Sequence, residues 1–339
     1  MKKSLLALAV LGAFAGAAQA QSAVTIYGSF DGGVRHVTDV NAAGDSRTTM
    51  GSTGTFNSNR LGFRGVEDLG GGLKARFTLE AGFNTGTGGL DTPTAAGAPS
   101  VLFNRTAAVG LGGNWGFIDL GRQYTNAFLT IAAYDPFVYK FPGIAQAVPA
   151  TAGVRYNNDI KYTGTFGPVT ARAEYALGEV AGSVRTGSAR SISANYSSGP
   201  IAAGAAYTLR DVAGFDNDHW TVGGAYKFGP ARVSIGYANE QQDVAVGADT
   251  ETKFAWVGLN YAITPAIELT YAYYRNRRDA AAAAAEGEKD LHMLAATYAL
   301  SKRTNLYAEF DTAKNEGVFR AAPNQSRQRG ISIGVNHLF

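Results

Sequence analysis

The sequence predicts an all-β fold, a sixteen-stranded antiparallel β-barrel that spans a membrane. Three observations lead to this prediction. Apolar and polar residues alternate over long stretches, short turns alternate with long loops, and no apolar run after residue 20 reaches the length of a membrane-spanning helix. The chain has 339 residues and no cysteine, so we expect neither a disulfide framework nor a thiolate metal site.

The alternation is clearest in residues 59–83. Apolar side chains occupy every second position, at Leu61, Phe63, Leu73, Ala75, Phe77, Leu79, Ala81 and Phe83. Charged side chains lie between them, at Arg60, Arg64, Lys74, Arg76 and Glu80. Strands with this pattern have one apolar and one charged face. A soluble sandwich would turn the charged face to bulk water, whereas a barrel in lipid turns the apolar face outward and the charged face into its lumen.

Aromatic residues beside the turns favour the barrel over the sandwich, because they form an interfacial girdle in membrane barrels. They are Tyr162, Phe166, Tyr196, Tyr226, Phe228 and Tyr261. A closed barrel also leaves no unpaired strand edge in lipid. We therefore predict apolar side chains outside and charged side chains inside.

The strand number follows from the turns. Seven short turns contain Gly, Pro or small polar residues, at 66–72, 111–116, 164–168, 197–200, 227–230, 262–265 and 300–304. Eight longer polar or Gly/Ala-rich segments lie between them, near 37–56, 84–100, 123–152, 179–187, 211–216, 240–250, 277–287 and 313–327. Together they join sixteen strands, and an even number brings both chain ends to the rim with the short turns.

The first twenty residues predict a secretory signal peptide. Lys2 and Lys3 precede an apolar run that ends in Ala18-Gln19-Ala20, the pattern of a signal peptide cleaved after Ala20. We expect a single barrel domain over residues 21–339, outside the cytoplasm. Removal of the two lysines lowers the formal net charge from +3 to +1, so no nucleic-acid partner is expected.

Four segments carry a resemblance to a known family. They read SAVTIYGSFDGGV (22–34), SNRLGFRGVEDLGGGLKARFTLEAGF (58–83), FNRTAAVGLGGNWGFIDLGRQY (103–124) and GVNHLF (334–339). Together they resemble the general diffusion porins of Gram-negative outer membranes, of the betaproteobacterial branch. The resemblance implies an outer-membrane homotrimer in which each subunit has its own pore, and in which the third long loop folds into the lumen. It also implies contacts with outer-membrane lipid and lipopolysaccharide, no cofactor, and a terminal Phe339 read by the barrel-assembly machinery.

The same resemblance implies the site residues. Arg60 and Arg105 match basic positions of the wall that faces the third loop, and Arg122 lies where a strand enters that loop. Near the loop's tip the sequence has Asp135 and Lys140, fewer acids than related porins have. Arg155 is the arginine nearest to a further basic position of the family.

Alternation can be applied to these arginines independently. It places Arg60, Arg64 and Arg76 in the lumen, and it places Arg155 there with Asn157, Asp159 and Lys161, opposite Val154, Tyr156, Ile160 and Tyr162. Arg105 shares the phase of apolar Ala107, Val109 and Leu111, so alternation alone does not turn it inward, and its inward direction rests on the resemblance. If Arg105 faces the lumen, the small residues Ala108 and Gly110 in the other phase face outward, where they would suit a subunit contact.

Cations around a narrow channel raise the local concentration of anions. We therefore expect a passive channel for ions and small hydrophilic solutes that prefers anions. Its constriction would be lined by Arg60, Arg105, Arg155, Arg64, Arg76 and Arg122, with Asp135 and Lys140 on the inward loop.

Two alternatives remain open at this stage. One is a substrate-specific channel, with Tyr134, Phe137, Tyr139 and Phe141 as an aromatic track. The other is a structural or adhesive barrel with a plugged lumen. An enzyme is not expected, because the four histidines are scattered without metal-ligand spacing and no catalytic cluster is evident.

Overall fold

A computed structural model describes residues 23–50, 54–91, 101–145 and 153–339. The expected signal peptide, residues 1–20, lies outside the described residues, as does Gln21. Among the residues that are described, no helix is long and apolar enough to cross a membrane. Short helical segments are α2 (Asn126–Ile131) and two 3-10 turns, η1 (Ala283–Ala285) and η2 (Gly317–Phe319).

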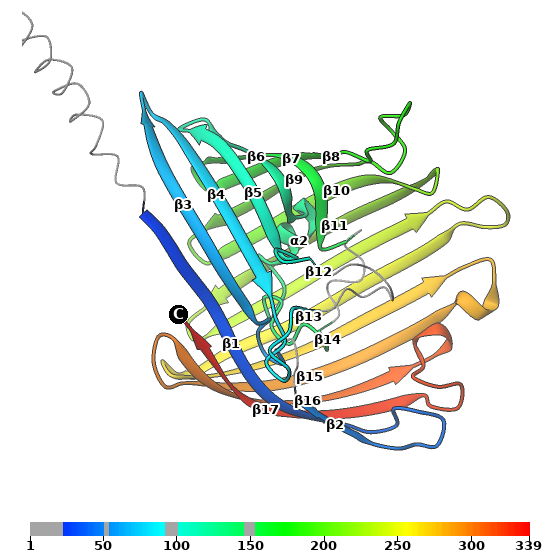
Figure 1. The fold of residues 1–339 in the computed structure, drawn as a ribbon. Helices are drawn as coiled ribbons and strands as arrows, with labels where there is room; N and C mark the ends of the chain where they lie inside the picture. The colour runs from blue at the N-terminus through cyan, green and yellow to red at the C-terminus, as the bar shows by residue number, and fades with distance from the viewer. Residues whose placement is uncertain (1–22, 51–53, 92–100, 146–152) are drawn as a thin grey trace, which may run out of the picture.

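The described part of the chain forms one sheet of seventeen strands (Figure 1). The strands are β1 (Ala23–Val37), β2 (Arg47–Met50), β3 (Arg60–Gly70), β4 (Leu73–Gly82), β5 (Thr106–Gly113), β6 (Gly116–Tyr124), β7 (Arg155–Phe166), β8 (Val169–Ala176), β9 (Ala189–Ser198), β10 (Ile201–Val212), β11 (Phe215–Phe228), β12 (Ala231–Gln242), β13 (Thr250–Thr264), β14 (Ile267–Asp279), β15 (Gly287–Ala299), β16 (Thr304–Asn315) and β17 (Arg327–Leu338).

The sheet closes on itself through β1. One edge of β1 pairs with β17, from Ser29 opposite Leu338 to Val37 opposite Gly330. The first half of its other edge pairs with β3, from Ala23 opposite Val66 to Ser29 opposite Arg60. The last four residues of that edge pair with the short strand β2, from Val34 opposite Met50 to Val37 opposite Arg47. Strand β1 together with β3 to β17 therefore makes a closed antiparallel barrel of sixteen strands, which confirms the predicted number.

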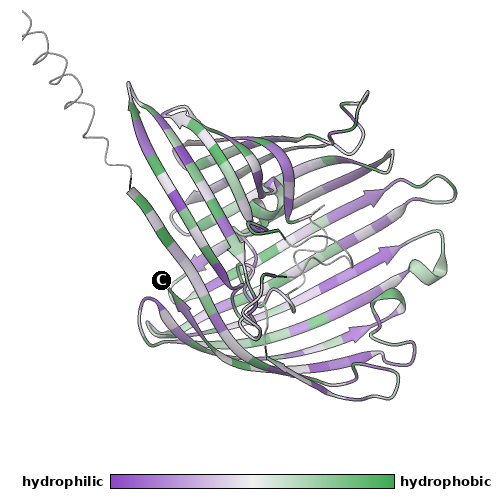
Figure 2. Ribbon diagram, in the orientation of Figure 1, coloured by the Kyte–Doolittle hydropathy of each residue, from purple (hydrophilic) through white to green (hydrophobic). Residues whose placement is uncertain are grey.

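The two faces of the barrel differ as predicted. Apolar side chains point outward and are exposed, for example Ile333 at 59% and Ile235 at 63%, whereas Glu174 and Glu309 on lumenal faces are buried. Along the strands, hydrophobic and hydrophilic residues alternate (Figure 2). The outside of the barrel is thus the apolar face, as a strand that borders lipid on one side and a polar lumen on the other requires.

The short turns lie at one rim with both ends of the described chain, and the longer loops lie at the other (Figure 1). The prediction of a longer loop at residues 211–216 is wrong. Strands β10 and β11 continue to a two-residue turn of Ala213 and Gly214, both with positive φ, as in a tight hairpin. The polar residues Asp211 and Asp216 are strand residues that pair with each other near this turn, where apolar alternation gives no signal.

The expected outward direction of Ala108 and Gly110 is also wrong. In the register of β4 and β5, Ala108 lies opposite Thr78 and Gly110 opposite Arg76, so both face the lumen. Val109, by contrast, is 57% exposed on the outside. The small residues of β5 therefore make room inside the barrel and do not form an outer contact.

The C-terminus lies at the seam where the barrel closes. The Gly28 N–H donates to the Phe339 carbonyl at 3.1 Å, and the Phe339 N–H donates to the Gly28 carbonyl at 3.3 Å. The Phe339 ring packs 5.6 Å from the Phe30 ring, centroid to centroid. A Cβ at position 28 would lie 2.4 Å from the Phe339 ring, so only a glycine at this position leaves enough space for the ring.

We predict that Phe339→Ser lowers the fraction of assembled barrel several-fold while export continues. The substitution removes an aromatic contact worth about 0.5–1.5 kcal/mol at the closing seam, in addition to the terminal ring that the resemblance links to assembly. The folded fraction can be measured from the gel mobility of unheated membrane samples. The control is Phe228→Ser, an outward ring that is 52% exposed and away from the seam. Equal folded fractions in the two variants would contradict the prediction.

Candidate functional site

The third long loop, described over residues 125–145 and 153–154, enters the lumen directly after β6, and its first turn is the short helix α2 (Figure 1). Thr125 caps this helix, because its Oγ1 accepts a hydrogen bond from the Phe128 N–H at 3.2 Å. The Asn126 N–H donates to both carboxylate oxygens of Glu174 on β8, at 3.0 and 3.1 Å. The helix is thereby fixed against the inner wall at β8.

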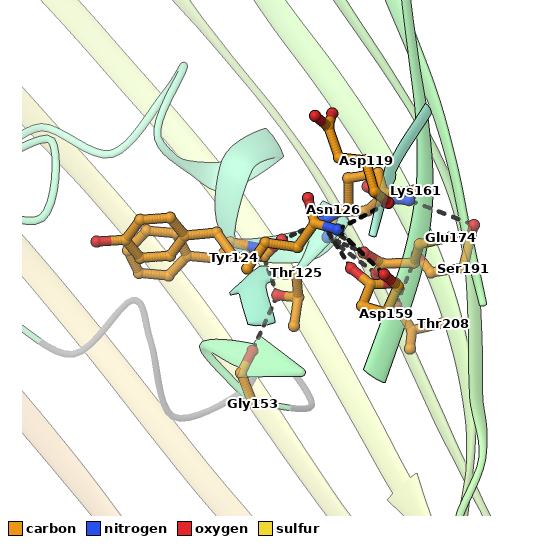
Figure 3. A network of polar contacts seen from close by, with 12 residues as sticks. Asp119, Tyr124, Thr125, Asn126, Gly153, Asp159, Lys161, Glu174, Ser191 and Thr208 are labelled. Atoms are coloured by element: carbon orange, nitrogen blue, oxygen red, sulfur yellow. Dashed lines mark hydrogen bonds and ion pairs between the residues drawn. The ribbon is translucent and has the colours of Figure 1, made fainter. Parts of the chain in front are cut away.

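A buried ion group supports this attachment (Figure 3). The Lys161 Nζ lies 3.2 Å from an oxygen of Asp159 and 3.0 Å from an oxygen of Glu174. The same ammonium donates to the Tyr124 carbonyl at the end of β6. All three charged side chains are buried. Because a buried charge without its partner is costly, these contacts hold the start of the loop in one position.

The middle of the loop follows the inner wall from β11 to β14. The Tyr134 hydroxyl is 2.9 Å from that of Thr221 on β11, and the Trp256 Nε1 on β13 donates to the Tyr134 carbonyl at 3.3 Å. The Asn260 amide on β13 donates to the Pro136 carbonyl at 3.0 Å. Glycines at 223 and 258 create the space, since a Cβ there would lie 2.3 Å from the Tyr134 ring and from Pro136 respectively.

The region of the loop around Phe141 is held by a segment of the first loop, residues 54–59, which sequence reasoning missed. The Phe141 N–H donates to the Phe56 carbonyl at 2.8 Å. The Phe56 ring stacks on Tyr307 of β16, with centroids 5.1 Å apart, and meets the Phe141 ring edge to face at 5.3 Å. The Lys140 ammonium lies 5.2 Å from the centre of the Phe56 ring. The first loop thus fixes the third loop near its tip.

Asp31 on β1 holds this segment in turn. Its side chain is fully buried. One carboxylate oxygen accepts hydrogen bonds from the Thr55 N–H at 3.0 Å and the Tyr307 hydroxyl at 2.8 Å, and the other accepts from the Asn57 N–H at 3.0 Å. The Asp31 N–H donates to the Asn59 Oδ1 at 2.6 Å. One carboxylate therefore organises the whole segment.

Four cationic side chains border one cavity of about 380 Å3 between the loop and the wall: Arg60, Arg105, Arg155 and Lys140. A second cavity, of about 450 Å3, lies on the other side of the loop's tip and shares Val138 and Lys140 with the first. The structure thus brings together Arg60 and Arg105, the two wall positions that the resemblance matches, with Arg155 and one loop lysine.

Glu80 on β4 pairs with two of these arginines. Its carboxylate lies 2.6 Å from the Arg105 Nε and 3.9 Å from the Arg60 Nε. The Tyr27 hydroxyl donates to it at 3.1 Å, and Arg105 also donates to the Tyr124 hydroxyl at 2.6 Å. The carboxylate fixes the direction of the two guanidinium groups and reduces their mutual repulsion.

Arg155 ends a column of stacked planar groups. Its guanidinium lies 4.1 Å from the centre of the Tyr124 ring. The Tyr124 ring stacks on Phe128 at 4.5 Å, and Phe128 stacks on Tyr139 at 3.8 Å, centroid to centroid. The column connects the wall to the loop's tip, so Arg155 keeps its place through ring contacts as well as through its strand.

Alternation alone does not explain the direction of two of these arginines. Arg105 precedes the first residue of β5, so the outward phase of Val109 does not extend to it. In β7, the register shifts opposite β6 between Tyr156 and Asp159, and Asn158 has φ of +52°. This bulge breaks the expected common phase of Tyr156 and Ile160. The argument that placed Arg155 by alternation is therefore wrong, although its side chain borders the cavity.

Three further expected arginines are not among the residues that line this cavity. Arg76 forms a two-pronged ion pair with Asp119 on β6. Arg122 donates to the Asn104 carbonyl and to Asn157. Arg64 lies 5.1 Å from the centre of the Tyr27 ring. Arg76 and Arg122 are therefore engaged with the wall and the loop bases.

The two charged residues of the loop's tip differ in environment. Asp135 is fully buried, and its carboxylate accepts hydrogen bonds from the Tyr274 hydroxyl at 2.8 Å and from the Tyr139 N–H at 2.7 Å. Burial raises the pKa of this carboxyl group. Burial lowers the pKa of Lys140 to about 8; the nearby Arg60 acts in the same direction and Asp31 in the opposite one. The loop therefore presents its lysine to the cavities and keeps its acid against the wall.

The four aromatic residues of the alternative track do not form one continuous exposed surface: Phe137 and Phe141 border one cavity and Tyr139 borders the other. Tyr134 and Phe141 are fully buried and Phe137 is 5% exposed, because these rings pack against the wall strands and against Phe56. Within the described residues, no group of three or more His, Asp or Glu side chains is arranged to hold a metal ion.

We predict that Asp31→Ala loosens both loop segments. The substitution leaves two backbone N–H groups and a hydroxyl without their acceptor, and each buried orphan costs about 1–3 kcal/mol. Amide hydrogen exchange should therefore become at least about tenfold faster in residues 54–59 and at Phe141. The control is Asp311→Ala, which removes another buried lumenal carboxylate, one that pairs with Arg35. Unchanged exchange at Thr55 and Asn57 in Asp31→Ala would contradict this role.

Comparison with known proteins gives consistent results. A model of the Gram-negative porin family matches residues 7–318. The chain is 33% identical to outer membrane porin protein 32 of Delftia acidovorans and 29% identical to an outer membrane porin protein of Bordetella pertussis, over the full length of both chains in each case.

Solved structures agree. An anion-selective porin from Comamonas acidovorans has 28% identity and a TM-score of 0.80, over 94% of this chain and all of that one. OmpT, an outer membrane protein of Vibrio cholerae, has a TM-score of 0.70 at 15% identity, over 94% of this chain and 98% of that one, which shows the shared fold alone. With the closed sixteen-stranded barrel, these matches establish that the chain belongs to the Gram-negative porin family and lies in the outer membrane.

Proposed function

We propose that this porin is a passive diffusion channel that prefers anions, with its selectivity set by Arg60, Arg105, Arg155 and Lys140. The observation that carries the proposal is the charge around the cavity beside the loop. Four cations border it, and Glu80 is the carboxylate that pairs with two of them. The whole-chain charge is small, so the preference comes from this local placement.

The expected strength follows from the surroundings. Two unit charges about 4 Å apart interact by roughly 1 kcal/mol in bulk water and about 4 kcal/mol at an intermediate effective dielectric. A hydrated channel lies toward the lower value, so several cations together give a preference and not an exclusion of cations. Salt weakens it, because the Debye length falls from about 10 Å at 0.1 M to about 3 Å at 1 M.

The anchoring of the loop favours an open channel over a plugged barrel. The loop's polar contacts run along the wall from β8 to β14, and cavities remain on both sides of its tip. The burial of Tyr134 and Phe141 weakens the case for a substrate-specific channel with an aromatic track. The family and the fold point to a channel rather than to an enzyme.

We extend the proposal to assembly. The chain would be exported with a cleaved signal peptide, residues 1–20, and inserted by the barrel-assembly machinery with Phe339 as part of the signal. The mature residues 21–339 would form one domain and associate as a homotrimer with one pore per subunit. The support is the family membership, and native mass spectra in detergent report the number of chains directly.

We predict that Arg60→Ser combined with Arg105→Ser moves the zero-current potential in a salt gradient toward the cation side. The double variant removes two of the four cations and leaves Glu80 without its two guanidinium partners. The anion-to-cation permeability ratio should fall several-fold, more clearly at low salt than at 1 M.

Arg172→Ser is the matched control. Arg172 is a lumenal arginine on β8 that donates to Asn195 and is not among the residues lining the cavity, so its loss should change the ratio much less. A wild-type channel that prefers cations would overturn the assignment, and so would equal changes in the control and the double variant.

We predict that the anion preference weakens as the pH rises through about 8. Lys140 is charged below its lowered pKa of about 8 and neutral above it, whereas the arginines stay charged. The permeability ratio should therefore decrease between about pH 6 and pH 9.5. In Lys140→Met the ratio should be lower at pH 6 and nearly constant over this range. A constant ratio in the wild type, or an equal slope in Lys140→Met, would contradict this role.

A further inference from the structure

Three aromatic rings border the cavity beside the loop, and the anion preference proposed above gives them no role. Tyr124, Phe128 and Tyr139 line this cavity of about 380 Å3 together with the four cations. All three residues are partly exposed, whereas Tyr134 and Phe141 are fully buried. Charge alone attracts an inorganic anion, so the rings point to a ligand with an apolar part.

The column of stacked groups presents ring edges to the cavity. The Phe128 ring is nearly parallel to its two neighbours, at interplanar angles of 9° to Tyr124 and 6° to Tyr139, so both of its faces are covered. The Tyr124 ring is covered by Phe128 on one face and by the Arg155 guanidinium on the other. The edge of an aromatic ring is positive and its face is negative, so these edges attract the face of another aromatic ring.

Two of the four cations remain available to a ligand carboxylate. Arg105 is engaged by Glu80 at 2.6 Å and by the Tyr124 hydroxyl, whereas Arg60 approaches Glu80 only through its Nε, at 3.9 Å. No carboxylate of the described residues lies within 4.0 Å of the Lys140 ammonium. Burial lowers the pKa of this ammonium and Arg60 lowers it further, so the two cations are near neighbours. A ligand carboxylate between Arg60 and Lys140 would relieve their repulsion.

We propose that this cavity selects aromatic carboxylates, anions of the size of benzoate, from among the anions that enter the channel. This selectivity rests on the proposed anion preference and adds the class of anion that is retained. The carboxylate contacts Arg60 and Lys140, and the face of the ligand ring lies on the edges of Tyr124 and Phe128. A cavity of about 380 Å3 is at the small end of the range of about 300–1,000 Å3 for small-molecule pockets, which suits a ligand with one ring.

The edge-to-face contact distinguishes aromatic from saturated rings. Benzoate and cyclohexanecarboxylate carry the same charge and similar apolar bodies, but the saturated ring has no π face to place on the ring edges. Such a contact strengthens binding about two- to tenfold. Cyclohexanecarboxylate is the bulkier of the two acids, so simple obstruction of the channel would favour it. Stronger binding of benzoate therefore reports the aromatic contact.

The experiment measures how each acid reduces the chloride current of the porin in a planar lipid bilayer near neutral pH. We expect the concentration that halves the current to be about two- to tenfold lower for benzoate than for cyclohexanecarboxylate. Pentafluorobenzoate, whose ring face is positive, should need a several-fold higher concentration than benzoate. Benzamide, which has the same shape without the charge, should reduce the current much less.

Phe128→Leu removes the central ring of the column and should bring the half-blocking concentrations of benzoate and cyclohexanecarboxylate close together. Their ratio is measured within one channel, so a change of channel width acts on both acids alike. The matched control is Phe117→Leu. Phe117 is a lumenal ring under the Arg76 guanidinium and lies outside both lumenal cavities, so its loss should leave the ratio unchanged.

Equal half-blocking concentrations of benzoate and cyclohexanecarboxylate in the wild type would overturn the aromatic selectivity, and so would equal values for benzoate and either pentafluorobenzoate or benzamide. An unchanged ratio in Phe128→Leu, or an equal change in Phe117→Leu, would also overturn it. If Phe128→Leu does not assemble, the comparison with pentafluorobenzoate decides, because it uses the wild-type protein. A wild-type channel that prefers cations in a salt gradient would instead contradict the proposed function, and the aromatic selectivity with it.

Discussion

Closure of the sheet between β1 and β17 is the constraint on which the rest of this structure depends. In lipid every backbone N–H and C=O must find a partner within the protein, so the first and last strands have to pair. Strand β1 does this with two partners on its other edge, first β3 and then β2. Once the ring is closed, each strand borders lipid on one face and the lumen on the other, and the alternation of side chains follows.

A closed ring of sixteen strands encloses a lumen too wide for wall side chains to fill. The width near its middle is therefore set by the third loop, and the loop's position depends on buried polar contacts at its start and near its tip. Lys161 and Glu174 fix its start, and Asp31 fixes the region of Phe141 through Phe56. Such contacts are strong while complete and costly when one member is lost, and they act together with the apolar packing of Tyr134 and Phe141 against the wall strands to fix the loop.

This division explains what the sequence could predict. The strand number follows from the turns, and the outward apolar faces and the lumenal direction of Arg60 follow from local alternation, because Arg60 is the first residue of β3 and is paired in its ladder. Arg105 lies just before its strand, and Arg155 is separated from the regular part of β7 by the bulge at Asn158, so alternation does not determine the direction of either. The contact of Asp31 with Tyr307 joins residues 276 positions apart, and the sequence contains no local pattern for it. Loop anchoring is non-local, and it therefore required the structure.

The position of Asp135 determines the sign of the proposed field in the channel. A loop acid that faced the wall arginines across the lumen would give a transverse field, positive on one side and negative on the other. Here the carboxylate of Asp135 accepts hydrogen bonds from the Tyr274 hydroxyl and from the backbone of the loop itself, and Lys140 faces the cavity instead. Both sides of the cavity are then positive, with Glu80 as a partial counter-charge on the wall. A passing anion is attracted from the loop and from the wall, and the geometry that buries one aspartate is therefore as important to the proposed selectivity as the arginines themselves.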